Sequence, residues 1–478
     1  MLSKKLLLPL LIILLEAPLI AQKAKDKIIQ DLDKNISKYS EIAKDIWEYA
    51  EVGYQEEKST ALLQSVLKKE GFTIKQGVAG MPTAFVATYG SGSPTIAILA
   101  EFDALPGISQ DAVPERKVVK EGAAGHACGH HLFGTGSMAA GIAVKNWLKS
   151  SGTSGTIRVY GTPAEEGGAG KVYMVREGLF EDVDAVLHWH PSSRNGAGAK
   201  SSLANKSAKF RFYGKASHAA ASPEKGRSAL DGVEAMNLMV NMLREHVPAE
   251  ARIHYVITRG GEAPNVVPEF AEVFYYVRHP EMEIVKETFE RVVNTAEGAA
   301  LGTGTKMEYE VIHGLYNVLP NETLSKIMFR NLQKVGGVEY NQEEKLFAEK
   351  ILATYDPDGL TTESAGLIDP YVYSPRGSGG STDVGDVSWA VPTAGMNAAT
   401  WVPGTSAHSW QAVAAGGTTI GFKGMMVAAK TLATTAYDLF KDPSVLAPAK
   451  EELLSRRGDN FRYESLLGDR LPPLDYRK

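Results

Sequence analysis

Three predicted strands in the first half of the chain end in acidic or histidine side chains. The apolar run 95–100 leads to Glu101 and Asp103, the run 156–161 to Glu165-Glu166, and the run 185–187 to His188 and His190. Helical segments alternate with these strands, which favours an α/β fold with a mainly parallel sheet. Open sheets of that kind bind ligands at the carboxyl ends of their strands. The pattern therefore predicts one site that collects these side chains.

The stretch 125–131, Gly-His-Ala-Cys-Gly-His-His, holds the only cysteine of the chain and three of its 11 histidines. A thiolate and an imidazole two residues apart, Cys128 and His130, can both reach one metal ion or one of a close pair. The alternative is that Cys128 is a small buried hydrophobe, the commoner role of a lone cysteine. With one cysteine, no intrachain disulfide is possible.

Further candidate ligands come from the strand ends and from a small-residue loop near the C-terminal helix. Adjacent glutamates can point different ways, so that Glu166 binds a metal while Glu165 stays free as a base that takes a proton from water. A dinuclear site with open positions for water and substrate needs about this many ligands. The set is Cys128, His130, Glu166, His190 and His408, with His188 as a rival to His190.

A change of pattern near residue 204 predicts an inserted domain. Strands and helices over 205–315 follow the order β-α-β-β-α-β, which is typical of a ferredoxin-like unit. The length of 478 residues also favours two domains. We therefore expect a catalytic domain formed by 22–204 and 316–478, with the inserted domain between its two parts.

The first 21 residues are typical of a secretory signal peptide. Lys4 and Lys5 precede the apolar run 6–15, and Leu19-Ile20-Ala21 is a plausible cleavage site. An uncleaved N-terminal anchor is the alternative. We expect an exported, periplasmic protein that does not bind a membrane after cleavage. The net charge of -5 gives no reason to expect a nucleic-acid partner.

Combined, these motifs resemble the M20 metallopeptidase/amidohydrolase family, and within it the Cys-containing amidohydrolases. The resemblance is carried by His-Ala-Cys-Gly-His at 126–130, the Glu165-Glu166 pair, the strand ending near His190, and Gly-Thr-Ser-Ala-His-Ser-Trp at 404–410. The segments 100–107 and 380–389 add to it. It covers essentially the whole mature chain.

The resemblance implies two divalent metal ions, Zn or Mn, bound by the five ligands given above. Hydroxide bound to metal would attack the substrate, with Glu165 as the general base and Asp103 orienting a ligand. Two positions depart from the family pattern: Glu101 stands where the broader family has a histidine, and His131 stands where this branch commonly has an aspartate.

For the inserted domain, the resemblance implies a lid that also forms a homodimer. His218 would reach the neighbouring active site and stabilise the oxyanion, while Asn265 and Arg278 would bind the substrate carboxylate. The implied reaction is hydrolysis of the amide bond in N-acyl or N-aroyl amino acids, such as p-aminobenzoyl-glutamate, or in dipeptides. The alternative function is a catalytically weak protein on the same fold that binds a carboxylate ligand.

Overall fold

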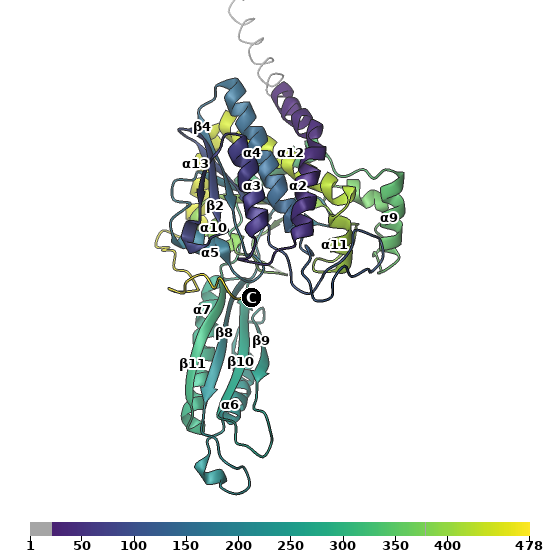
Figure 1. Ribbon diagram of the computed structural model, residues 1–478. Helices are drawn as coiled ribbons and strands as arrows, with labels where there is room; N and C mark the ends of the chain where they lie inside the picture. Colours follow the sequence, from purple (N-terminus) through teal and green to yellow (C-terminus); the bar gives the residue numbers. More distant parts are fainter. Residues whose placement is uncertain (1–21, 378) are drawn as a thin grey trace, which may run out of the picture.

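The computed structural model describes residues 22–377 and 379–478, so the predicted signal peptide lies outside the described residues. Figure 1 shows two parts: a larger α/β body, and a smaller sheet with helices packed on it that projects from the body as an arm. Each part has its own cluster of buried apolar side chains. The predicted fold class, a mainly parallel α/β domain carrying a separate antiparallel α+β unit, is confirmed.

The larger body is built on a seven-stranded sheet with parallel central strands. Its order is β1 (Thr73–Gln76), β2 (Phe85–Ser91), β4 (Gly155–Gly161), β3 (Thr95–Ala100), β5 (Ala185–Ser192), β13 (Thr393–Ala399) and β6 (Gly196–Ala197). The pairs β4–β3, β3–β5 and β5–β13 are parallel, and the flanking pairs are antiparallel. Every residue of β3 is buried, as its apolar sequence requires of a central strand.

Two long helices lie side by side against the central strands. They are α4 (His130–Ser151) and α12 (Thr419–Lys441), and both are rich in small residues. At Gly141 of α4, a Cβ atom would lie 2.4 Å from the side chain of Val159 in β4. The small residues therefore let the helix approach the sheet closely, which brings the start of α4 to the carboxyl ends of the strands.

The remaining elements of the body are mostly helices around this core. They are α2 (Ile36–Tyr49), α3 (Glu57–Lys69), α5 (Gly170–Arg176), α8 (Glu322–Val335), α9 (Gln342–Leu352), α10 (Val384–Ala390), α11 (Trp410–Gly416), α13 (Leu446–Arg457), and the short parallel pair β7 (Ala199–Lys200) and β12 (Tyr373–Ser374). Among the described residues, no single helix is long and apolar enough to cross a membrane; α11 and α12 meet that criterion only together, across a 75° bend.

The projecting arm is an antiparallel sheet in the order β11 (Lys306–Leu315), β8 (Ala204–Tyr213), β10 (Phe270–His279), β9 (Arg252–Arg259). Helices α6 (Ala229–Leu243) and α7 (Met282–Thr303) pack on it. The chain order is the predicted β-α-β-β-α-β. Strand β9 is an outer strand, as β11 is on the other edge, and its side chains Tyr255, Val256 and Ile257 are exposed.

The segment 380–389, one of those that resemble the family, makes hydrogen bonds to elements that are distant from it in the sequence. The carboxylate of Asp383 binds both the backbone N–H and the Nζ of Lys171 at the start of α5. Asp386 accepts hydrogen bonds from the backbone N–H of Tyr316, at 3.0 Å, and from the hydroxyl of Tyr463, at 2.7 Å. Asp386 therefore ties the end of β11 to the segment that follows α13.

Replacing Asp386 by asparagine should change how stability depends on pH. Burial raises the pKa of Asp386 to about 7 from an ordinary 3.8. Because the pKa of Asp386 is higher in the folded protein than in the unfolded chain, its contribution to the free energy of unfolding is complete below about pH 4. That contribution is lost as the pH rises through 7. Asparagine does not titrate, so the stability of Asp386→Asn relative to the unchanged chain should rise by about 3 kcal/mol between pH 5 and pH 8.5.

Denaturant unfolding of both proteins at the two pH values measures this difference. Asp45→Asn, at an exposed aspartate on α2, is the matched control and should show little change. A relative stability of Asp386→Asn that does not vary with pH would show that this aspartate is already ionised in the folded protein.

Candidate metal centre

The candidate metal centre lies where the ends of β3, β4 and β5 meet the start of α4. The loop 125–129 precedes α4, and Gly129, with φ of 76°, turns the chain into that helix. The loop 404–409 before α11 is tied to it, because the backbone N–H of His408 donates to the carbonyl of Ala127 at 2.9 Å. Segments far apart in sequence thus converge on Cys128.

Cys128 belongs to two groups of possible ligands. Its Sγ lies 3.4 Å from Nε2 of His190. Cys128, His130 and His190 offer ligand atoms that all lie within 4.8 Å of one another, and so do Cys128, Glu166 and His408. Between Nε2 of His408 and Oε1 of Glu166 the distance is 3.2 Å. The structure therefore brings together all five predicted ligands, with the cysteine shared between the two groups.

Hydrogen bonds to the far side of the imidazoles orient two of these ligands. Asp103 accepts from Nδ1 of His130 at 2.8 Å, and the carbonyl of Pro191 accepts from Nδ1 of His190 at 2.7 Å. Each histidine therefore turns the lone pair of Nε2 toward the centre, which is the usual role of a carboxylate or carbonyl behind a metal ligand. The other oxygen of Asp103 accepts the backbone N–H of Glu166 at 2.9 Å.

A third group adds the carboxylate of Glu101, which the sequence placed near the site but not among the predicted ligands. Oε2 of Glu101 lies 3.1 Å from Nε2 of His130, and both groups lie within 4.8 Å of Glu165. Lys171 holds the other oxygen of Glu101 at 2.6 Å and contacts Asp383 at 2.7 Å. Only the tertiary structure could show this, because a buried lysine in α5 carries no local signal of its partners.

The electrostatics of the site fit a pair of cations. Burial raises the pKa of the Cys128 thiol, and burial together with Glu101 and Glu166 raises that of Glu165. Among the described residues, three buried atoms at the centre make close contacts without hydrogen-bond geometry: Oε2 of Glu101 and Nε2 of His130, which lie beside each other, and Oε1 of Glu166, which lies beside His408. Divalent ions would satisfy these atoms and would stabilise the thiolate. Sulfur, imidazole and carboxylate together suit Zn or a similar first-row ion.

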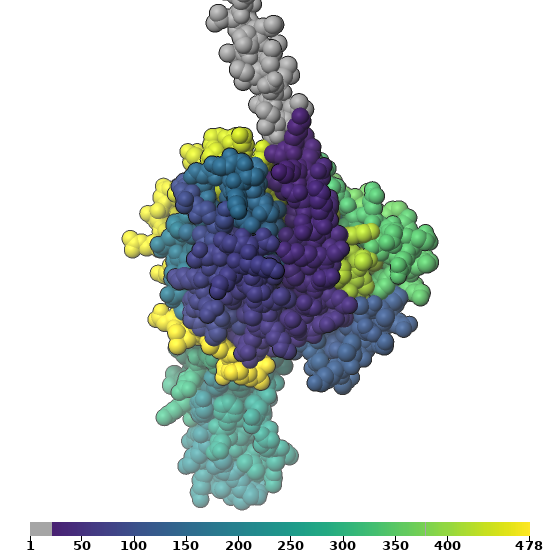
Figure 2. Space-filling model, turned by 45° about the horizontal axis from the view of Figure 1, so that its top comes forward, coloured from purple at the N-terminus to yellow at the C-terminus, as the bar shows by residue number. Residues whose placement is uncertain are grey.

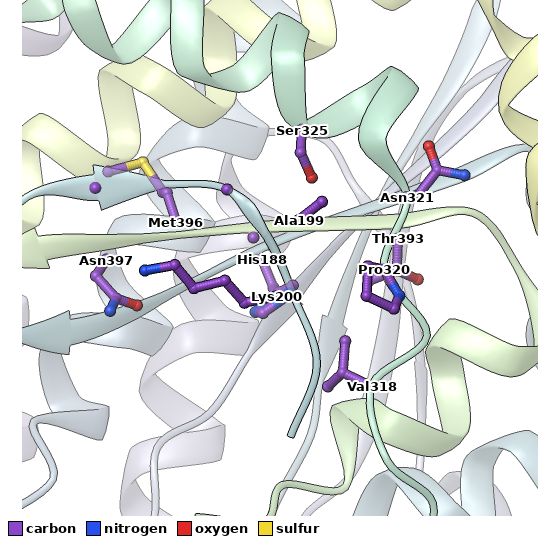
Figure 3. Close-up of a pocket in the computed structure, with 13 residues that line it drawn as sticks. His188, Ala199, Lys200, Val318, Pro320, Asn321, Ser325, Thr393, Met396 and Asn397 are labelled. Carbon is purple, nitrogen blue, oxygen red and sulfur yellow. The ribbon is translucent and has the colours of Figure 1, made fainter. Parts of the chain in front are cut away.

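His188 lies in a different place from His190, although the two are neighbours on one face of β5. The sequence predicted that the strand ends at Leu187, but β5 continues to Ser192, so both histidines are part of it. His188 lines a separate cavity of about 150 Å³ between β5, β13 and the start of α8 (Figure 3). The geometry thus favours His190 as the ligand.

The other histidines of the 125–131 stretch are packing residues. Nε2 of His126 bonds to the carbonyl of Ile46, and Nε2 of His131 bonds to that of Gly416, both at 3.0 Å. Their rings lie 4.8 Å apart, and burial lowers the pKa of both. His131, which replaces the aspartate common in this branch, is therefore a neutral side chain that holds α11 against α4.

The predicted residues of the inserted domain lie at opposite ends of the arm. Arg278 is near the end of β10, beside the larger body, whereas the loops after β8 and β9, which hold His218 and Asn265, are at the far end (Figure 1). His218 and Asn265 lie together, since His218 forms a β-bridge with Val266 and the N–H of Ala219 donates to the carbonyl of Asn265. Within one chain, the far end of the arm does not reach the metal centre.

The ring of His218 is held in one tautomer. Its Nδ1 accepts the backbone N–H groups of Ala220, at 3.2 Å, and Ala221, at 3.1 Å. The neutral ring must then carry its proton on Nε2. The exposed imidazole is therefore a hydrogen-bond donor, as the stabilisation of an oxyanion requires.

The fold and the converging ligands define the class of protein: an α/β metallohydrolase with an inserted α+β domain. Residues 97–356 match the model of peptidase family M20/M25/M40, and the chain belongs to this family of peptidases and amidohydrolases. It is 43% identical to the B subunit of p-aminobenzoyl-glutamate hydrolase from Escherichia coli over 446 residues, which cover 88% of this chain and 93% of that protein. It is 30% identical to the Xaa-Arg dipeptidase of Mus musculus over 452 residues, or 91% and 93% of the two chains.

Solved structures share the fold. An aminobenzoyl-glutamate utilization protein from Klebsiella pneumoniae matches with a TM-score of 0.59 at 19% identity, over 86% of this chain and 98% of that one. A structure described as a dinuclear metal binding peptidase from the M20 family, from Bacillus subtilis, matches with a TM-score of 0.58 at 19% identity, over 86% and 99%. The fold is thus that of M20 dinuclear metal-binding peptidases.

Proposed function

We propose that this protein hydrolyses the amide bond between an acyl or aroyl group and an amino acid, with p-aminobenzoyl-glutamate-like compounds as the best substrates and short dipeptides next. The observation that carries this proposal is the glutamate pair at the end of β4, in which Glu166 joins Cys128 and His408 while Glu165 lies beside them. The 43% identity to a p-aminobenzoyl-glutamate hydrolase supports the substrate class.

The five ligand residues would hold two divalent ions. Asp103 would fix the ring of His130 and the backbone of Glu166 in position through its two hydrogen bonds. When bound, such ions polarise the amide carbonyl and make a water molecule easier to deprotonate. Glu165 accepts the proton of the attacking water and then passes it to the leaving amine.

Hydrolysis of a substrate panel tests the proposal directly. The protein, loaded separately with Zn and with Mn, is assayed on p-aminobenzoyl-glutamate, benzoyl-glycine, an Xaa-Arg dipeptide and a carboxylate-free amide. We expect kcat/KM to be highest for the aroyl-glutamate and to be lost after treatment with a chelator. Binding of the aroyl-glutamate without hydrolysis under any metal would instead identify a carboxylate-binding protein.

We also propose that two chains form a homodimer through the arm. The outer strand β9 has an unpaired edge and exposes Tyr255, Val256 and Ile257, and α6 exposes Leu238 and Met242. An exposed strand edge with apolar side chains is a ready surface for pairing with a second copy. In such a dimer, His218 and Asn265 of one chain could serve the metal centre of the other, while Arg278 serves its own.

Mixing two inactive variants should restore activity if the site is shared. Glu165→Gln lacks the base, and His218→Ala lacks the donor, but a mixed dimer combines one intact base with the intact histidine of its partner. One of the two sites in each mixed dimer is then complete, so the purified mixed dimer should show about half of the unmodified activity. Co-expression with two affinity tags and an assay of the doubly purified dimer measures this. No recovery in a verified mixed dimer would place His218 outside the partner's site.

The location of the protein is a separate proposal. The composition of residues 1–21 supports export with cleavage after Ala21. Fractionation and N-terminal sequencing of the mature chain should find Gln22 as its first residue in the periplasm. A protein that keeps Met1 in the cell fraction would contradict the proposal.

A further inference from the structure

The segment that follows α13 crosses the junction between the two parts of the molecule. Residues 458–478 form neither strand nor helix. They run as a yellow chain along the boundary between the body and the arm (Figure 1), and the yellow atoms there lie on both (Figure 2). The segment therefore lies at the root of the arm, where the arm joins the body.

Hydrogen bonds attach this segment to both parts along its length. Arg470 donates to the carbonyl of Ile312 at 2.8 Å and pairs with Glu310 at 3.0 Å, both in β11 of the arm. In the body, Arg176 donates to the carbonyl of Arg470 at 2.7 Å, and Gln55 donates to that of Leu474 at 2.8 Å. The path of the segment is thus set by specific contacts.

The last of these contacts are made to the candidate ligand Glu166. Its backbone carbonyl accepts the hydroxyl of Tyr476 at 3.1 Å and Nη2 of Arg477 at 2.8 Å. The Tyr476 ring packs edge-on against Tyr54, with centroids 5.7 Å apart, and a Cβ at Gly53 would lie 2.2 Å from the Tyr476 hydroxyl. The tyrosine therefore fits a space that only glycine leaves open.

With these contacts, both backbone polar groups of Glu166 are held by hydrogen bonds. Its N–H is held by Asp103, and its carbonyl is held by two donors from the far end of the chain. The next residue, Gly167, has φ of 101°, and Ala164 before the pair has φ of 58°. A loop in such conformations stays in place only where its surroundings hold it.

We propose that Tyr476 and Arg477 are positioning residues of the metal centre, which hold the carbonyl of Glu166 and so aim its carboxylate at the cations. The inference rests on the proposed function only in assuming that Glu166 binds metal. Charge-assisted donors such as a guanidinium give the stronger hydrogen bonds, so Arg477 contributes more than Tyr476.

The charge of Arg477 also lies near that of Arg278, the arginine expected to bind the substrate carboxylate. Burial raises the pKa of Tyr276 in β10, and the positive charges of Arg278 and Arg477 oppose that rise. The charges of both arginines therefore act on the hydroxyl of Tyr276, at the root of the arm. A direct contact of Arg477 with the substrate carboxylate is therefore the outcome that the test must separate from positioning.

Metal binding by Arg477 variants tests the proposal without using turnover. Arg477→Met should weaken the binding of the more labile ion by about 10- to 100-fold, as is usual when a residue supporting a ligand is lost. Arg477→Lys keeps one charged donor and should recover part of that loss. Titration with Co²⁺, followed by its visible absorption spectrum, gives the affinity and the ligand environment, and Tyr476→Phe should give a smaller change.

Arg462→Met is the matched control, because Arg462 is an exposed arginine of the same segment that makes no contact with the loop in the described structure. A Co²⁺ affinity and spectrum unchanged in Arg477→Met would overturn the proposal. A rise in KM for aroyl-glutamate with metal binding intact would also overturn it, in favour of direct substrate contact. If the unmodified protein binds Co²⁺ but hydrolyses nothing in the panel, the proposed function fails while the positioning role can still be measured.

Discussion

Replacing Glu165 by glutamine is expected to lower kcat by about 10³-fold, within the range that a lost general base costs, while both metal ions stay bound. Glu165 lies within 4.8 Å of Glu101 and His130 at the end of β4, but it is the member of the pair that does not join Cys128 and His408. Glutamine keeps the shape of the side chain and removes its ability to accept and return a proton. KM should change little, because binding does not require that proton.

Steady-state kinetics on p-aminobenzoyl-glutamate, together with the metal content per chain, measures both parts of this prediction. Glu177→Gln, at an exposed glutamate just after α5, serves as the control and should retain full activity. Turnover above a tenth of the unmodified rate would remove Glu165 from the role of base. Loss of metal together with turnover would instead make Glu165 a ligand, as its proximity to Glu101 and His130 allows.

Replacing Cys128 by alanine should weaken both metal sites at once. The Cys128 thiol is a member of two groups of possible ligands, one with His130 and His190 and the other with Glu166 and His408. Every other member of these two groups belongs to only one of them. We therefore expect the metal content after dialysis against a weak chelator to fall from about two ions per chain to one or none, and turnover to fall by at least about 10³-fold, since both ions support the reaction.

Elemental analysis and thermal unfolding with and without metal check this result. Metal raises the melting temperature of a protein that binds it only when folded, so this rise should be smaller in Cys128→Ala. Cys128→Ser keeps a weaker ligand and should give an intermediate result. Two tightly bound ions in Cys128→Ala would show that the cysteine is only a buried apolar residue.

Regular elements were predictable where one local pattern dominates. Strand β3 was predicted at 95–100, where it lies, because it is apolar on both faces. Strand β5 was predicted too short, because His188 and His190 resembled loop residues. In the structure His188 lines a cavity and His190 approaches Cys128, both on one face of the strand, while Trp189 is buried on the other.

The start of α4 also carries no clear local pattern. The small residues from Gly134 onward are typical of a closely packed helix, but α4 begins earlier, at His130, directly after the positive φ of Gly129. A histidine at the first turn of a buried helix carries no pattern of its own. Its position follows from Asp103, which lies 27 residues earlier and binds its Nδ1.

The amino-acid sequence by itself determined the family, the order of the elements and the residue types that converge on the centre, because these depend on motifs and on short-range periodicity. Only the tertiary structure decided that His190 rather than His188 approaches Cys128, and that Glu101, Lys171 and Asp383 form a buried ionic group behind the ligands. It alone brought Arg477 to Glu166, 311 residues away. Such contacts are set by the packing of distant segments, and no local spacing in the chain records them.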